Sequence, residues 1–289
     1  MNSKKKRSPL YEVWLRLRVQ PMAMVTLSGI IILILVAIFA DVIADYNGMA
    51  LMQVPANKLL PPSAEHIFGT DNFGRDMFAR IVHGARIAVL ISFTSVIFST
   101  TVGIILACSA TLFGGKVDMV IMRVIDVLSA IPNIVIALSI VAGLGAGVWQ
   151  LVVAMGISSI PMPTRMIRSK AISIVNMEYI ESAKALGAKT PHIITNHLVP
   201  NLISIILVVG TSQIAGAIMT TATLSFLGLG VTPPAPEWGL MLNDGMTYMR
   251  RDPHMVYVPG AAVLLTSLCV AIFGDFLRDA FDPQLKGRI

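Results

Sequence analysis

Long stretches of apolar residues most restrict what this chain of 289 residues can fold into. A helix needs about 20 mostly apolar residues to cross the hydrocarbon core of a bilayer. Six stretches approach or exceed that length. They cover approximately residues 22–40, 87–113, 119–142, 148–164, 202–229 and 256–274. The sequence therefore predicts an all-α membrane protein with six transmembrane helices.

Composition and charge agree with this class. Only 13% of the residues are charged and 55% are apolar, whereas soluble domains carry roughly 25% charged residues. If the N-terminus is cytoplasmic, most of the 22 Lys and Arg residues lie on the cytoplasmic side, as the positive-inside rule requires. The predicted orientation is N-in and C-in. The basic side chains then face the cytoplasmic leaflet of membrane lipid, and no nucleic-acid partner is needed to explain them.

The same reasoning divides the chain into segments. We expect a cytoplasmic N-terminal segment (1–21), a first transmembrane helix (22–44), an extracytoplasmic loop (45–86), a transmembrane core (87–277) that contains a polar loop (166–201), and a cytoplasmic tail (278–289). The polar loop is unusual, because it is long and helix-prone although apolar stretches flank it. A passive connector would be shorter, so we expect this loop to contact another protein.

The polar loop is expected to contain two short helices. The first covers 177–186, and Gly187 is placed to end it in a left-handed conformation. Thr190 resembles an N-cap residue followed by proline, so a second helix is expected over 191–199. Pro200 is expected to stop that helix before the fifth apolar stretch begins.

The first loop helix presents a face of mostly small residues. That face consists of Ile180, Ala183, Ala185 and Leu186, with Glu178 and Glu181 beside it. Small side chains let the backbone of another protein approach closely. The alternative is an amphipathic helix on the lipid surface, but such helices carry bulky apolar side chains on one face. A protein-docking helix is the better interpretation.

The loop resembles the EAA loop of ABC importer permeases, which has the pattern E-A-A, x3, G, x9, I-x-L-P. Glu181, Ala183, Gly187 and Pro200 match it in spacing, Ser182 replaces the first Ala, and His197 and Val199 occupy the I and L positions. The resemblance implies a coupling helix that sits in a groove on a cytoplasmic ATPase subunit. The residues that it assigns to coupling are Glu178, Glu181, Ala183, Gly187 and Pro200.

Four further segments resemble dipeptide, oligopeptide and nickel permeases, and the C-type (second) permease in particular. They are "FGTDNFGRDMFARIVHGAR" (68–86), "GGKVDMVIMRVIDVLSAIP" (114–132), "LSFLGLGVTPPAPEWGLML" (224–242) and "FGDFLRDAFDPQL" (273–285). The resemblance implies a type I ABC importer permease in the plasma or inner membrane of a bacterium or archaeon. Its implied partners are a second homologous permease in a heterodimer, two ABC ATPase subunits that bind ATP and Mg, and an extracytoplasmic substrate-binding protein.

The sequence contains no motif that indicates an enzyme. It has no Walker A segment, no G-x-S-x-G and no H-E-x-x-H. The five His residues and two Cys residues have no metal-ligand spacing. We therefore expect no catalytic residue, no metal site and no cofactor bound by this chain.

The segment 68–86 is rich in charge. A helix beginning near Gly74 would bring Asp76 close to Arg80. The favoured interpretation is a loop pinned by glycine turns and ion pairs at the outer membrane boundary. The alternative is direct contact with a substrate-binding protein or lining of the outer gate, for which the candidates are Asp71, Arg75, Asp76 and Trp238.

The third apolar stretch contains polar residues. Arg123 and Asp126 are three residues apart, and they are expected either to pair with each other or to line the translocation path. Asn133, just after Pro132, is the better candidate for a pathway residue.

The predicted function is that of a transmembrane subunit forming half of the translocation pathway of an ATP-driven, binding-protein-dependent importer for dipeptides or oligopeptides. One alternative is the same machine carrying nickel or a metal–ligand complex, since that branch shares the quoted segments. An alternative of another class is an ion-coupled secondary transporter. That class should show buried acidic residues and inverted repeats, and neither is evident in the sequence.

Overall fold

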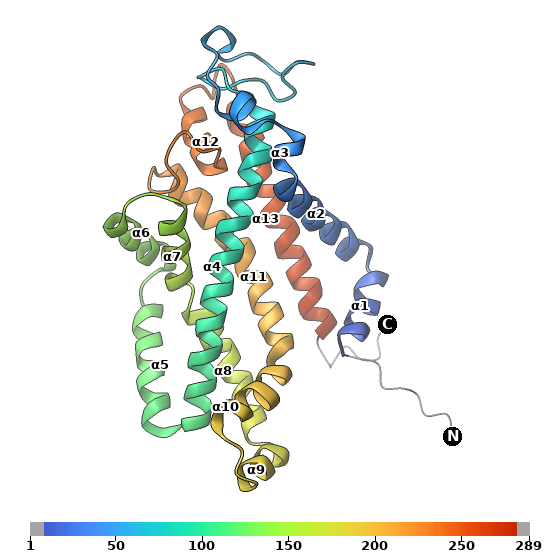
Figure 1. The fold of residues 1–289 in the computed structure, drawn as a ribbon, viewed down its shortest axis with the longest axis vertical. Coiled ribbons are helices and arrows are strands. Elements are labelled where there is room, and N and C mark those ends of the chain that lie inside the picture. The colour runs from blue at the N-terminus through green and yellow to red at the C-terminus, as the bar shows by residue number, and fades with distance from the viewer. Residues whose placement is uncertain (1–8, 282–289) are drawn as a thin grey trace.

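The computed structural model describes residues 9–281, and within that range it contains helices but no strand. Four long helices lie side by side along the molecule (Figure 1). They are α2 (Pro21–Ile38), α4 (Met77–Phe113), α11 (Val199–Phe226) and α13 (His254–Phe281). Helix α11 packs against both α4 and α13, and α2 packs against the same two helices.

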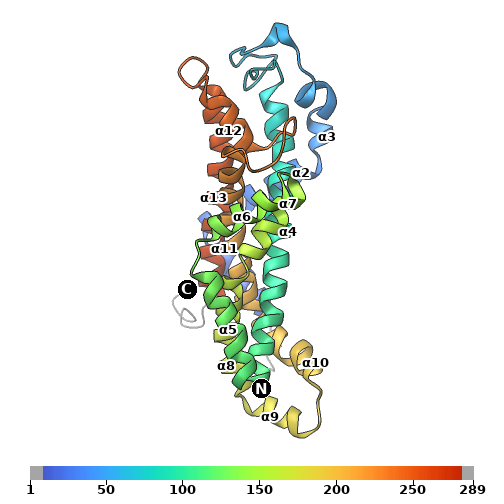
Figure 2. The ribbon, with the colours of Figure 1, turned by 90° about the vertical axis from the view of Figure 1, so that its left-hand side faces the viewer.

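Shorter helices are placed around this bundle. They are α1 (Pro9–Val19), α3 (Ala40–Ile43), α5 (Gly115–Ser129), α6 (Asn133–Leu144), α7 (Val148–Ser158) and α8 (Pro161–Val175). Helices α9 (Glu178–Ala185) and α10 (Thr190–Ile193) lie at one end of the molecule. Helix α12 (Trp238–Met246) and the segment before α4 lie at the opposite end, as Figure 2 shows.

Four helical stretches in the described part of the chain are long and apolar enough to cross a membrane. They are Pro21–Ile38, Met77–Phe113, Thr190–Phe226 and His254–Phe281, and the count rises to five if α5 and α6 form one bent span. The chain is therefore a helical protein with several candidate spans. The six-span count and the orientation stay predictions.

The predicted third span is not one continuous helix but is broken into two, and whether the pair crosses the membrane as one bent span stays a prediction. Helix α5 ends at Ser129, α6 begins at Asn133, and the pair is bent by 86°. Pro132 explains the break, because proline lacks an N–H group and disfavours the helical conformation in the residue before it.

The predicted fourth span is also divided, into α7 and α8. Helix α7 ends at Ser158 and α8 begins at Pro161. Proline is tolerated in the first turn of a helix, since the N–H there has no intrahelical partner. Helix α8 continues to Val175, so the expected loop 166–201 begins inside a helix.

Helix α4 begins at Met77 rather than near residue 87, because Asp76 caps it. The Asp76 carboxylate accepts a hydrogen bond from the backbone N–H of Ala79 at 2.8 Å. At 1.5 Å per residue, this helix of 37 residues is about 55 Å long. The hydrocarbon core measures about 30 Å, so α4 extends well beyond it and carries the preceding loop.

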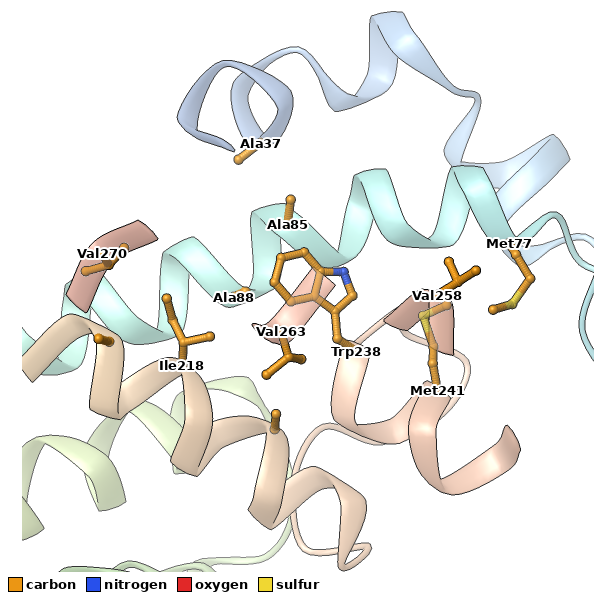
Figure 3. Close-up of a cluster of buried hydrophobic side chains, with 12 residues drawn as sticks. Ala37, Met77, Ala85, Ala88, Ile218, Trp238, Met241, Val258, Val263 and Val270 are labelled. Atoms are coloured by element: carbon orange, nitrogen blue, oxygen red, sulfur yellow. The ribbon is translucent and has the colours of Figure 1, made fainter. Parts of the chain in front are cut away.

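A cluster of buried apolar side chains joins α2, α4, α11, α12 and α13 near the α12 end. Trp238 lies at its centre among Ala85, Ala88, Ile218 and Val263 (Figure 3). The small residues on α4 leave room for the indole ring. A Cβ atom on Gly84 would collide with that ring, so a larger residue there would push the ring away.

Candidate functional site

Helix α9 is attached to the rest of the protein mainly through one side chain. Ile180 is fully buried (0% exposed) in a cluster that includes Ile167 of α8, Cys108 of α4 and Leu198. The predicted helix over 177–186 is confirmed, since α9 covers Glu178–Ala185. Ile180 therefore faces this chain and does not belong to a free docking face.

The acidic side chains of α9 are open to a partner. Glu178 and Glu181 are exposed, and Ala183 is half-buried. Gly187 follows α9 with φ +82°, and nothing lies within 4 Å of the Cβ atom that another residue would place there. The left-handed conformation predicted for Gly187 is confirmed.

The second loop helix differs from the prediction. Its N-cap is Lys189, so Thr190 is the first helical residue and not the cap. The helix does not stop at Pro200, because α10 passes through a π-helical turn (Ile194–Leu198) directly into α11. The wider turn keeps the proline ring clear of the preceding turn, which lets the chain stay helical there.

Helices α5 and α8 are joined by two ion pairs. The Asp126 carboxylate lies 2.6 Å from Arg165, and Asp118 accepts hydrogen bonds from Arg168 at 2.6 and 2.5 Å. The hydrogen bonds that Arg168 donates to Asp118 raise the pKa of Arg168. The expected Arg123–Asp126 pair was therefore wrong, because long-range packing supplies Asp126 with another partner.

At the opposite end, a buried ion-pair cluster organises the segment before α4. Asp71 Oδ2 lies 2.6 Å from Nε of Arg75 and 3.5 Å from Nε of Arg80. Asp244 lies 3.9 Å from Arg75 and adds a second carboxylate. Asp71, Arg75 and Arg80 are at most 3% exposed, so one buried carboxylate is shared by two buried guanidinium groups, and the partly exposed Asp244 (27%) lies at the edge of the cluster.

Arg80 also connects distant parts of the chain. Its NH1 group donates to the carbonyl oxygens of Ala50 at 3.1 Å and Pro234 at 3.3 Å. The Asp76 carboxylate contacts His66 Nδ1 at 2.8 Å and caps α4. The expected side-chain pairing of Asp76 with Arg80 was wrong, because Asp76 is the cap and Arg80 turns toward Asp71.

All four candidates for contact with a binding protein lie in the interior. Asp71, Arg75, Asp76 and Trp238 are at most 5% exposed. The indole N–H of Trp238 donates to the carbonyl oxygen of Ile81 at 3.1 Å. These side chains hold the segment in place, as the favoured interpretation had it, and they do not present an exposed contact surface.

Glu237, which the sequence analysis did not single out, caps α12. Its Oε2 accepts a hydrogen bond from the backbone N–H of Leu240 at 2.8 Å, and the side chain is 3% exposed. Burial raises the pKa of Glu237 to about 6. No local signal identifies this residue, since its burial comes from the packing of α12 against α11 and α13.

Two neighbouring cavities that share lining residues follow one face of α11. Asn133, the predicted pathway residue, lines a cavity of about 170 Å³ together with residues of α7, α8 and α11. A second cavity of about 290 Å³ lies toward the α10 end and includes Lys170 and Arg278. Met162 and Ser212 line both cavities.

The α11 lining has helical spacing. Ser204, Val208, Ser212, Gly216 and Thr220 recur every four residues along it. The sequence analysis missed this stripe, although its i, i+4 spacing of small and polar residues was a readable signal. On α8, Met162, Met166 and Lys170 face the same space.

Comparison with known proteins identifies the family. The sequence profile described as "Binding-protein-dependent transport system inner membrane component" matches residues 99–287, more than half of the chain. The chain belongs to this family. A second profile, "N-terminal TM domain of oligopeptide transport permease C", matches residues 8–62. This permease is thus a multi-pass protein of the inner membrane, and the resemblance found in the sequence is confirmed.

Curated relatives match the permease over nearly its whole length. The glutathione transport system permease protein GsiD of Escherichia coli O6:K15:H31 is 41% identical over 97% of this chain and 92% of its own. The dipeptide transport system permease protein DppC of Alkalihalophilus pseudofirmus is 41% identical over 96% of this chain and 91% of its own. Both relatives are named as permease proteins of transport systems.

A solved structure of the inward-facing MetNI methionine ABC transporter contains a chain of similar fold. The TM-score is 0.56 at 17% sequence identity, over 71% of this permease and 98% of that chain. At this identity the likeness concerns the fold alone.

Proposed function

We propose that this permease forms half of the translocation pathway of an ATP-driven, binding-protein-dependent importer for dipeptides or oligopeptides. The observation that carries the proposal is the 41% identity, along almost the whole chain, to permeases named for glutathione and dipeptide transport. Glutathione is itself a short peptide, so both names indicate the same class of cargo.

The importer would contain four kinds of subunit. A second homologous permease completes the pathway in a heterodimer, and an extracytoplasmic binding protein delivers the cargo. Two ATPase subunits bind ATP and Mg on the cytoplasmic side. With six spans and both ends of the chain in the cytoplasm, α9 and α10 meet those ATPases, and α12 lies on the outer side.

The connections of α9 and α10 support a role in coupling. Ile180 anchors α9 on α4 and α8, while α10 continues without a break into α11. A displacement of this loop by closing ATPases is therefore passed directly to α11. Since α11 lines both cavities, its movement would open the pathway alternately to each side.

Reconstitution tests the cargo and the energy source together. The complete transporter in proteoliposomes, supplied with its binding protein, should accumulate a labelled dipeptide when ATP is provided to the ATPase side. Removal of the ATPase subunits should abolish uptake. Uptake by this permease without them, driven by an ion gradient, would point instead to a secondary transporter.

A charge reversal tests the coupling role of α9. The Glu181 side chain is exposed on α9. Glu181→Lys should leave the permease folded but abolish co-purification with the ATPases or uncouple ATP hydrolysis from uptake, because an unpaired charge at an interface is costly. The matched control is Glu65→Lys, the same reversal at an exposed position beyond the opposite end of α4. Wild-type assembly and uptake in Glu181→Lys would remove α9 from the coupling role.

A further inference from the structure

The smaller cavity contains a buried amide with an open hydrogen-bonding position. Gln213 on α11 lines the cavity and is 9% exposed. Its Oε1 accepts a hydrogen bond from the Ser99 hydroxyl of α4 at 3.0 Å. Its Nε2 is buried and has no hydrogen-bond partner among the residues that the structure describes. Buried polar groups are normally paired, so an open position in the interior calls for an explanation.

The lining of this cavity is polar without being charged. Asn133, Ser158, Ser159, Ser212 and Thr220 surround Gln213, and none of the described lining residues carries a charge. These side chains offer both donors and acceptors. Such a lining suits a ligand that is itself neutral and hydrogen-bonding at the point of contact. It contrasts with the neighbouring cavity, where Lys170 and Arg278 are present.

The size of the cavity limits what it can hold. Pockets that enclose whole small-molecule ligands measure roughly 300–1,000 Å³, and this cavity measures about 170 Å³. It therefore accommodates a part of a cargo molecule and not the whole of it. One peptide group with a short side chain is a part of the right size.

We propose that Gln213 and Asn133 form a recognition point for the peptide group of the cargo as it passes through the permease. A primary amide pairs with a peptide group through one N–H and one C=O, and a half-turn of the side chain exchanges the two. The Ser99 hydroxyl occupies one lone pair of Gln213 Oε1, so the open Nε2 can donate to the carbonyl oxygen of a cargo peptide group while the second lone pair of Oε1 accepts its N–H. Recognition through the backbone is independent of the cargo's side chains. This proposal rests on the proposed function.

The experiment measures uptake by the complete transporter in proteoliposomes, saturated with loaded binding protein. The probes are trialanine and its analogue with an ester in place of the second amide, which lacks that N–H group. Gln213→Leu should lower trialanine uptake about tenfold, the size expected for one lost hydrogen bond in a buried site. ATP hydrolysis stimulated by the loaded binding protein is measured alongside uptake to show that each variant has assembled with the ATPases. The control is Gln53→Leu at an exposed position outside the cavity.

The decisive quantity is the ratio of amide to ester uptake, because it cancels general effects on assembly. Wild type should prefer the amide, and Gln213→Leu should reduce that preference toward one. Asn133→Leu should also reduce the preference for the amide over the ester. Because Asn133 lies at an exposed helix start, this variant can be measured even if Gln213→Leu fails to fold. An unchanged ratio in either folded variant overturns this inference and leaves the proposed function standing. If wild type imports no trialanine in the presence of ATP, the inference fails together with the proposed function.

Discussion

The two ends of the molecule differ in whether their charged side chains are buried or exposed. At the α12 end, the charged residues Asp71, Arg75 and Arg80 are buried and pair with one another. At the α9 end, the charged residues Glu178 and Glu181 are exposed, and Ile180 is the buried residue that anchors the helix. Charges that satisfy one another inside a chain fix its shape, whereas charges left in solvent are available to a partner. The first end is therefore held by its own internal pairs, and the second is the end at which we propose that the ATPases dock.

The largest effect is expected where a buried charge loses its partner. Asp71→Ala would leave Arg75 and Arg80 without their shared carboxylate, and breaking a buried pair in this way typically costs about 3–5 kcal/mol. The melting temperature of the purified permease should fall sharply. As the control, Asp41→Ala removes the exposed 2.8 Å pair with Arg86, which should change the melting temperature far less because solvent screens an exposed pair. Equal effects of the two changes would show that the α12 end is not held by its buried charges.

A somewhat smaller loss is expected at the single anchor of α9. Truncation of a buried isoleucine costs roughly 2–5 kcal/mol, but in Ile180→Ala the loss should be local because α9 has few other buried contacts. Limited proteolysis should cut the loop between α8 and α10 faster than in wild type. The control is Leu186→Ala, since Leu186 is 88% exposed. Unchanged proteolysis in Ile180→Ala would mean that α9 is held by something else.

A pH effect should be confined to the α12 end. The pKa of Glu237 is about 6 in the folded protein, against 4.5 for an ordinary glutamic acid, because burial disfavours its charged form. Between these values the folded state binds more protons than the unfolded state, so stability decreases as pH rises. The protonated Glu237 carboxyl contributes about 2 kcal/mol to the free energy of unfolding. This contribution is fully present below about pH 4.5 and is lost as the pH rises past about 6. Melting curves at pH 4.5 and 7 should show this difference in wild type and lose it in Glu237→Gln, which keeps an acceptor for the α12 cap.

The smallest effect is expected at Gly187. Its φ of +82° disfavours other residues, but a Cβ atom there meets nothing within 4 Å. Gly187→Ala should therefore cost only the backbone strain, about 1 kcal/mol, and should not disturb the rest of the bundle. Gly84→Ala is the contrasting change, because its Cβ atom collides with Trp238. A larger loss of stability in Gly187→Ala than in Gly84→Ala would mean that residue 187 is tightly packed. It would contradict the open environment described for the α9 end.

Local patterns predicted several parts of this molecule correctly. The apolar stretches located the long helices, because burial of about 20 residues in lipid depends only on length and composition. The bounds of α9 and the conformation of Gly187 followed from residue type, since only glycine adopts positive φ without strain. The family resemblance rested on the same local spacings.

Tertiary structure decided the pairings and the interior. Asp126 could pair with Arg123 by spacing, yet it pairs with Arg165 of α8. Trp238 and Asp71 look like surface residues of a loop, but the packing of α12 and the length of α4 enclose them. The open amide of Gln213 becomes visible only when α6, α7, α8 and α11 surround one cavity. The sequence by itself determined the long apolar helices and the conformation of Gly187, because these depend on composition and residue type, whereas contacts between distant residues depend on how the helices pack.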